Sequence, residues 1–159
     1  MIDVVISGLL WFSAIGCGLL AGLYFAFSAF IMRALGRIEP PAGAVAMNAI
    51  NSAILRSAFM PLFVGSTLSC LLLAIVGLID PGQPGAPVMV AGGIVYVAGM
   101  FGVTMVFNVP LNNALASADA AHLGQVWSRN LKAWTLWNHV RTAASTASLA
   151  LFILAIGAK

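Results

Sequence analysis

Four long apolar segments occupy most of this chain and limit the folds that it can adopt. They cover about residues 4–32, 58–79, 88–112 and 131–157. Each is long enough to cross the hydrocarbon core of a bilayer as a helix, which takes about 20 residues. Hydrophobic residues make up 62% of the chain and charged residues only 7%, whereas about a quarter of a soluble domain is charged. We therefore predict an all-α integral membrane protein with a single transmembrane domain over residues 1–159.

The connections between the four segments are short and predict an up-down four-helix bundle. Residues 42–57 precede the second span and combine small side chains with Asn48 and Asn51. We interpret them as an amphipathic lead-in helix, or as protruding first turns of that span. Residues 80–87 form a turn-rich loop. Residues 114–130 are polar enough to be a connection, with or without a short helix.

Basic residues predict how the bundle lies in the membrane. Six of the seven fall at the connections on one side of the predicted bundle, and the seventh, Lys159, ends the chain. The positive-inside rule then places that side in the cytoplasm, with both termini outside, in an inner (cytoplasmic) membrane. The six are Arg33, Arg37, Arg56, Arg129, Lys132 and Arg141.

Several functional classes find no support in the sequence. Cys17 and Cys70 lie in apolar segments without C-x-x-C spacing, so we expect small packing residues. The two histidines and four acidic residues lack metal-ligand spacing, and we predict no metal site; a haem held by His139 alone stays a weak alternative. The spans lack carboxylates, which disfavours a proton-coupled transporter. Without a basic surface we expect no nucleic-acid partner. The Gly18–Gly22 spacing permits close helix contact or association with a second copy.

The last span carries polar residues near its start, where they are costly unless they have partners or a function. On a helical wheel, Trp134, Asn138 and Arg141 lie within about 60° of one another. Trp137 borders this face, whereas His139 lies about 140° away from Trp134. We predict that the first three act together and that His139 is not part of the site.

Polar residues of the other helices are predicted at the same depth. Tyr24 and Ser28 lie near the end of the first span, Asn51 precedes the second, and Asn108 and Asn112 flank Pro110 at the end of the third. We therefore predict a polar pocket on the cytoplasmic side. The candidate catalytic residues are Arg141, Asn108 and Asn138, and the candidate ligand contacts are Trp134, Trp137, Tyr24, Ser28, Asn51 and Asn112.

Each of these residues also has a structural interpretation. Tryptophan is enriched at membrane interfaces, and Arg141 can extend toward lipid headgroups. The asparagines can satisfy the backbone near Pro110, bond between helices or face water. His139 is then an interfacial or packing residue, and His122 is solvated.

Four motifs resemble the anthrone oxygenase-like family of small four-helix membrane proteins. They are AGLYFAFSAFIMRAL (residues 21–35), MNAIN (47–51), FNVPLNNAL (107–115) and W-x-x-W-N-x-x-R (134–141). The resemblance implies oxidation of an anthrone to an anthraquinone with dioxygen, without a cofactor. It implies that Arg141, with Asn108, Asn112 or Asn138, stabilises an oxyanion. Trp134, Trp137, Tyr24 and Phe27 are implied to stack on a flat aromatic substrate.

We therefore expect a pocket that binds a small aromatic or quinone-like molecule, with anthrone-type oxygenase activity as its implied chemistry. One alternative is a non-enzymatic binding or transport subunit whose polar cluster holds a lipid headgroup. The other is a structural protein whose polar residues hold the helices together.

Overall fold

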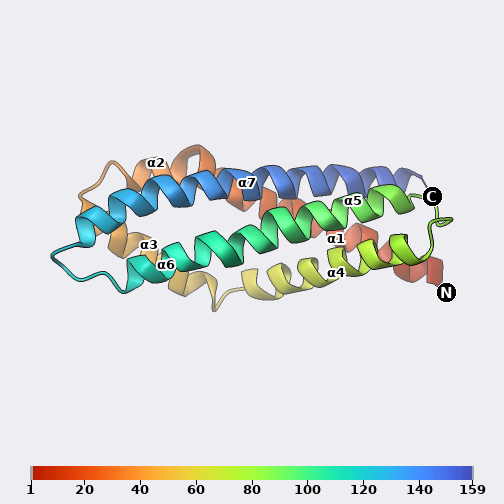
Figure 1. Ribbon diagram of the computed structural model, residues 1–159, viewed down its shortest axis with the longest axis horizontal. Helices are drawn as coiled ribbons and strands as arrows, with labels where there is room; N and C mark the ends of the chain where they lie inside the picture. Colours follow the sequence, from red (N-terminus) through yellow and green to blue (C-terminus); the bar gives the residue numbers. More distant parts are fainter. Residues whose placement is uncertain (1, 159) are drawn as a thin grey trace.

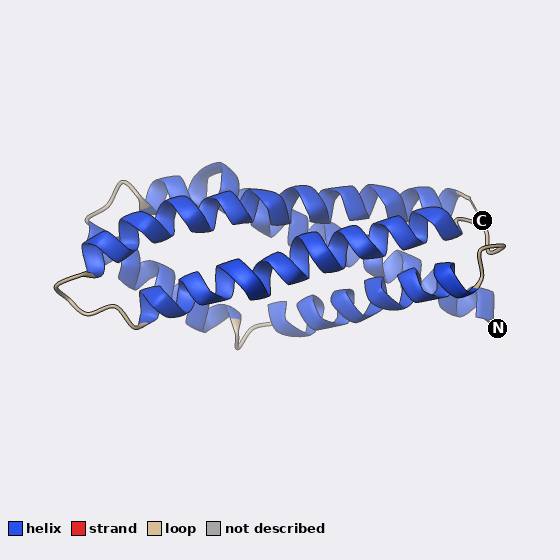
Figure 2. Cartoon of the chain, viewed as in Figure 1, coloured by secondary structure: helices blue, strands red, loops and turns tan. Residues whose placement is uncertain are grey.

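A computed structural model of the chain describes residues 2–158, which form helices joined by short loops (Figures 1 and 2). Four helices are long and apolar enough to cross a membrane: Ile2–Leu35, Phe59–Ile79, Ala86–Ala116 and Leu123–Gly157. The predicted all-α membrane bundle is thereby confirmed, and the chain is an integral membrane protein.

Two of the spans contain π-helical turns. The first consists of α1 (Ile2–Ala26), η1 (Phe27–Ile31) and α2 (Met32–Leu35). The third consists of α5 (Ala86–Tyr96), η2 (Val97–Gly102), η3 (Thr104–Asn108) and α6 (Val109–Ala116). Such wide turns are rare in proteins, and those that do occur are often found at functional sites. The remaining helices are α3 (Pro40–Ile54), α4 (Phe59–Ile79) and α7 (Leu123–Gly157).

The four spans form a ring in which each packs against two others. Helix α1 contacts α4 and α7, and α5 contacts the same two helices. Successive spans run in opposite directions, as an up-down bundle requires, and both chain ends lie at the same end of the bundle (Figure 1). The short helix α3 packs against α6 and α7 at the opposite end.

Two spans extend further than the sequence predicted. Helix α7 begins at Leu123, because Trp127 and Asn130 extend its buried face beyond the apolar segment. The third span was predicted to end at residue 112 but continues to Ala116, with Pro110 in the first turn of α6, directly after η3. The lead-in helix predicted over residues 42–57 is confirmed as α3, and a turn separates it from α4. Hydropathy therefore identified the apolar part of each span, but it did not identify the residues at which the helices begin and end.

The core at the terminal end of the bundle contains small polar contacts. Ser13 and Ser69 share a hydrogen bond of 2.7 Å between their hydroxyls, joining α1 to α4. The sulfur atoms of Cys17 and Cys70 lie 3.9 Å apart, and both side chains are buried as free thiols. These groups satisfy one another and let α1 and α4 approach closely, which is the packing role expected for the cysteines.

Helices α4 and α5 approach each other closely at Gly93. A Cβ atom there would lie 2.4 Å from the Cys70 carbonyl oxygen and 2.6 Å from the Ala74 Cβ. Gly22, which the sequence paired with Gly18, has no atom within 4 Å of its Cβ position. The Gly18–Gly22 pair thus does not form such a contact within the chain, and its role in self-association stays a prediction.

Gly93→Ala is expected to destabilise the bundle by about 1–3 kcal/mol, because the added methyl group forces two backbones apart. The matched control, Gly22→Ala, is expected to leave stability unchanged or raise it, since alanine is favoured over glycine in a helix. Thermal unfolding in mild detergent measures both. Equal unfolding temperatures for the two variants would contradict the close approach.

The loops before α5 and before α7 lie at opposite ends of the bundle, and each has a local feature that stabilises its turn. Gly85, immediately before α5, has a φ of +80° that favours glycine. At the other end, the Asp119 carboxylate accepts a hydrogen bond from the His122 backbone N–H (2.9 Å) and lies 2.8 Å from the His122 Nδ1. These contacts hold the pKa of Asp119 below its usual range. His122 is exposed, as predicted.

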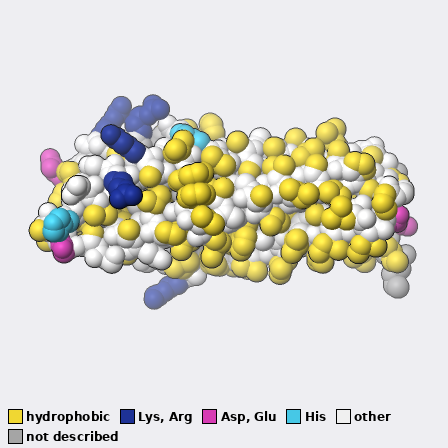
Figure 3. Space-filling model, viewed as in Figure 1, with side chains coloured by type: hydrophobic (Ala, Val, Ile, Leu, Met, Phe, Trp, Pro, Cys, Tyr) yellow, Lys and Arg dark blue, Asp and Glu magenta, His cyan; other side chains and the backbone are white. Residues whose placement is uncertain are grey.

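Basic side chains gather toward the end of the molecule opposite the termini (Figures 1 and 3). They are Arg33, Arg37, Arg56, Arg129 and Lys132, and all five are exposed. Arg141 was predicted with them but is buried in the bundle interior, with 5% of its surface exposed. Its helical face turns it inward, so it does not extend toward lipid headgroups. Lys159 lies outside the described residues.

Candidate functional site

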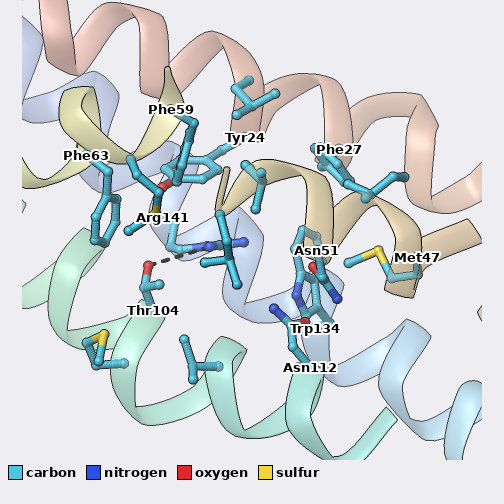
Figure 4. Close-up of a pocket in the computed structure, with 17 residues that line it drawn as sticks. Tyr24, Phe27, Met47, Asn51, Phe59, Phe63, Thr104, Asn112, Trp134 and Arg141 are labelled. Carbon is cyan, nitrogen blue, oxygen red and sulfur yellow. Dashed lines mark hydrogen bonds between the residues drawn. The ribbon is translucent and has the colours of Figure 1, made fainter. Parts of the chain in front are cut away.

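A cavity of about 280 Å³ lies in the half of the bundle that carries the basic residues (Figure 4). This volume lies just below the usual range of small-ligand pockets, about 300–1,000 Å³. Helices α1, α3, α4 and α7 and the segment from η3 to α6 all contribute to its wall. The lining residues are Leu23, Tyr24, Phe27, Met47, Ile50, Asn51, Ile54, Leu55, Phe59, Met60, Phe63, Thr104, Met105, Val109, Asn112, Trp134 and Arg141.

Arg141 of α7 provides the only formal charge among the described residues that line the cavity. Its guanidinium carbon lies 4.4 Å from the centre of the Tyr24 ring and 4.8 Å from that of Trp134. Aromatic faces attract a cation, and they do so more strongly away from water. The two rings therefore hold the guanidinium in place without neutralising its charge.

The hydrogen bonds of Arg141 are all to neutral groups. Its Nη2 donates to the Asn138 Oδ1 at 2.8 Å, and its Nη1 makes a long bond of 3.5 Å to the Thr104 Oγ1. The Nε has no partner in the structure. The four acidic residues of the chain are exposed, away from this interior. A buried charge without a counter-ion is costly, which makes Arg141 a strong candidate for binding an anionic group.

Asn138 lies behind Arg141 and fixes its position. The Asn138 Nδ2 donates to the Tyr24 carbonyl oxygen and to the Ser28 Oγ, both at 2.7 Å. Its Oδ1 is thereby oriented toward Arg141, one helical turn away. Asn138 does not line the cavity, and it holds Arg141 in position; its predicted catalytic role stays a prediction.

A second polar group faces the cavity from α3, α6 and α7. Asn51, Asn112 and Trp134 lie near one another in Figure 4. The Asn51 Nδ2, the Asn112 Oδ1 and the Trp134 Nε1 are all buried without a partner in the structure. Buried polar atoms are rarely left unpaired, so these three atoms can bind a water molecule or a polar ligand atom.

Five of the nine predicted residues line the cavity, and four do not. Tyr24, Asn51, Asn112, Trp134 and Arg141 line the cavity. The four that do not are Asn108, Asn138, Ser28 and Trp137.

The contacts of Asn138 are described above, and the other three residues also have contacts that explain their position. The Asn108 Nδ2 donates to the Trp134 carbonyl oxygen at 3.3 Å and joins η3 to α7. The Ser28 hydroxyl lies 3.3 Å from that of Thr142 and accepts from Asn138. Trp137 stacks on Phe107 with 3.6 Å between ring centres and lines a separate depression. The helical wheel placed Trp137 at the edge of the polar face. In the structure this edge position turns its ring away from the cavity and onto Phe107.

Sequence reasoning missed most of the apolar wall and one polar residue. Phe59 and Phe63 of α4 stack on each other, 5.5 Å apart, and line the cavity. They resemble lipid-facing residues of any span, so no signal identified them. Thr104 lies on the same helical face as Asn108 and Asn112, and this shared face could have predicted that Thr104 lines the cavity.

The cavity reaches the outer surface of the bundle. Leu55 and Met105 both line it, and they are 65% and 48% exposed. The cavity is therefore open on the side of the bundle where these two residues lie.

The described lining contains no aspartate, glutamate or histidine. His139 is exposed on the other face of α7, as predicted. Within residues 2–158, no three His, Cys, Asp or Glu side chains come together in a group suited to a metal. The expected absence of a cofactor stays a prediction.

The fold and the cavity define a small helical membrane bundle with a buried cation facing an apolar space. Comparison with protein-family models gives a match to anthrone oxygenase over residues 52–151. This match covers more than half of the chain, which therefore belongs to the anthrone oxygenase family. It includes Asn112, Trp134 and Arg141, whereas Tyr24 and Asn51 lie before it. No curated protein and no solved structure matches the chain.

Proposed function

We propose that the cavity binds a flat aromatic or quinone-like molecule and that the protein oxidises an anthrone-type substrate with dioxygen. The observation that carries this proposal is the buried guanidinium of Arg141, which faces an apolar cavity without a counter-ion. An aromatic ligand with one anionic oxygen supplies both the apolar surface and the missing charge. The family to which the chain belongs supports the choice of reaction.

The proposed reaction is balanced with dioxygen alone. Loss of a proton from the methylene carbon of an anthrone gives an enolate with its negative charge on the carbonyl oxygen. Dioxygen then oxidises that carbon: one oxygen atom becomes the new carbonyl, and the other takes the one hydrogen left on the carbon and leaves as hydroxide, which becomes water when it takes up a proton from the solvent. Arg141 is placed to stabilise the enolate oxygen, and a preorganised donor of this kind contributes about 2.7–4 kcal/mol. Asn51, Asn112 and Trp134 are placed to bind the neutral oxygens of the ring system.

The described lining contains no acid or histidine that could accept the methylene proton of the substrate. We propose that the substrate enters as an anion that has already lost its proton at the membrane surface. The path beside Leu55 and Met105 serves an apolar substrate that arrives from the bilayer. We further propose that the basic end faces the cytoplasm and that both termini lie outside, because five exposed basic residues gather at that end.

The pH dependence of kcat/KM tests this proton balance. Because only the ionised substrate reacts, kcat/KM should rise about tenfold per pH unit below the pKa of the free substrate and level off above it. Two anthrone-type substrates of different acidity should give profiles displaced by the difference between their own pKa values. Profiles with the same midpoint for both substrates would instead indicate a base on the protein.

The direct test of the proposed function measures oxygen uptake and quinone formation with purified protein in mild detergent. The variant Ile50→Trp places a large ring where Ile50 lines the cavity, whereas Val45→Trp places it on the exposed face of the same helix. We expect one oxygen molecule consumed per quinone formed by the wild type and by Val45→Trp, and nearly complete loss in Ile50→Trp.

Two results would contradict the oxygenase proposal. If the aromatic compound binds to the wild type without oxygen uptake, the protein is a binding or transport subunit. If it neither binds nor reacts, the polar residues of the cavity have the structural role alone.

A further inference from the structure

A groove on the outer surface between α2 and α7 collects three basic side chains. Arg33 and Arg37 approach it from the end of the first span, and Lys132 approaches it from α7. His139 lies in the same groove. The groove shares no lining residue with the cavity described above, so it is a separate feature of the molecule.

The three charges of the groove are not neutralised by the protein. The one ion pair within residues 2–158 joins His122 and Asp119, far along the chain from Arg33 and Arg37. No acidic residue lines the groove. Exposed cations gathered without a counter-ion create a local positive potential, which attracts an anionic ligand.

The floor of the groove is apolar and closely packed. Met32, Leu131 and Leu136 line it beside the basic residues. At Gly36 an added Cβ would lie 2.7 Å from the Leu131 Cδ2, so the glycine allows the end of the first span to lie directly on α7. Leu136 is 59% exposed on the outer surface of the bundle. The groove therefore presents charge at one side and hydrocarbon at the other.

We propose that this groove is a binding site for an anionic phospholipid. The phosphate lies among Arg33, Arg37 and Lys132, and an acyl chain runs over Leu136 along α7. Basic pockets between transmembrane helices bind anionic headgroups in this manner. His139 at the same groove donates a hydrogen bond to the headgroup, which gives His139 a role outside the cavity. The proposal does not depend on the proposed oxygenase function.

The test compares two double variants that remove the same charge. Arg33→Gln with Arg37→Gln removes two cations of the groove, whereas Arg56→Gln with Arg129→Gln removes two exposed cations elsewhere. Native mass spectrometry in detergent measures the Kd of phosphatidylglycerol, with phosphatidylcholine as the zwitterionic probe and inorganic phosphate as the headgroup alone. Circular dichroism checks that each variant is folded.

We expect wild-type protein to bind phosphatidylglycerol more tightly than phosphatidylcholine, and to bind inorganic phosphate much more weakly than either. The groove variant should bind phosphatidylglycerol about 30-fold more weakly, and the control variant within about twofold of the wild type. Equal losses in the two double variants would overturn the proposal in favour of a general charge effect. Equal affinity for the two lipids, or binding of phosphate as tight as that of the lipid, would also overturn it.

Discussion

Arg141→Met is expected to abolish binding of an anionic aromatic ligand while leaving the fold intact. Removing the cation that faces the cavity should weaken binding by about 2.7–4 kcal/mol, or roughly 100- to 1,000-fold. Stability should stay the same or rise, because replacing an unpaired buried charge by an apolar side chain of similar length removes a desolvation cost. The removal of this desolvation cost offsets the loss of the hydrogen bond that Arg141 donates to the Asn138 Oδ1. Calorimetric titration and thermal unfolding in the same detergent measure the two effects.

The matched control is Arg56→Met, which removes an exposed cation near the start of α4. It should change neither ligand binding nor stability by a measurable amount. Unfolding of Arg141→Met, together with normal binding by any folded fraction, would show that Arg141 holds the helices together and does not bind the ligand.

Asn138→Leu is expected to cause the largest loss of stability, about 3 kcal/mol. The substitution removes the bonds that Asn138 donates to the Tyr24 carbonyl oxygen and the Ser28 hydroxyl. It also removes the best acceptor of Arg141, and hydrogen bonds to a charged group contribute about 1.5–3 kcal/mol. Chemical denaturation in detergent measures the free energy of unfolding. Asn113→Leu, on the exposed side of α6, is the control and should be nearly neutral.

A double variant separates the two roles of Asn138. In Asn138→Leu with Arg141→Met, the charge that needed an acceptor is gone, so a large part of the lost stability should return. Such non-additivity is the signature of two residues in one network. A double variant that is destabilised by the sum of the single effects would contradict the coupling between Asn138 and Arg141.

The sequence was sufficient to predict the bundle and the inward face of its last helix. Four apolar segments of the right length leave few alternatives, and the wheel correctly turned Trp134, Asn138 and Arg141 inward and His139 outward. Both inferences depend on periodicity along a single helix, which the regular geometry of an α-helix fixes.

Properties that depend on contacts between helices could not be predicted. Asn108 and Asn138 were placed on the correct faces, yet each bonds to a neighbouring helix and so lies behind the cavity wall. Trp137 lies only about 60° from Trp134 on the wheel, but it stacks on Phe107 in another depression. Which polar residue reaches the cavity depends on how far each helix is rotated and on the π-helical turns, neither of which leaves a pattern in the sequence.

The central claim is that the buried charge of Arg141 holds the anionic oxygen of an aromatic ligand. The absorption spectrum of a bound hydroxyaromatic probe tests it directly, because a phenol and its phenolate absorb at different wavelengths. At a pH one unit below the pKa of the free probe, we predict the phenolate spectrum for the probe bound to the wild type. A probe bound to Arg141→Met should give the neutral phenol spectrum, since an apolar cavity disfavours an unpaired anion. A neutral spectrum in the wild type, or the same spectrum in both proteins, would contradict the claim.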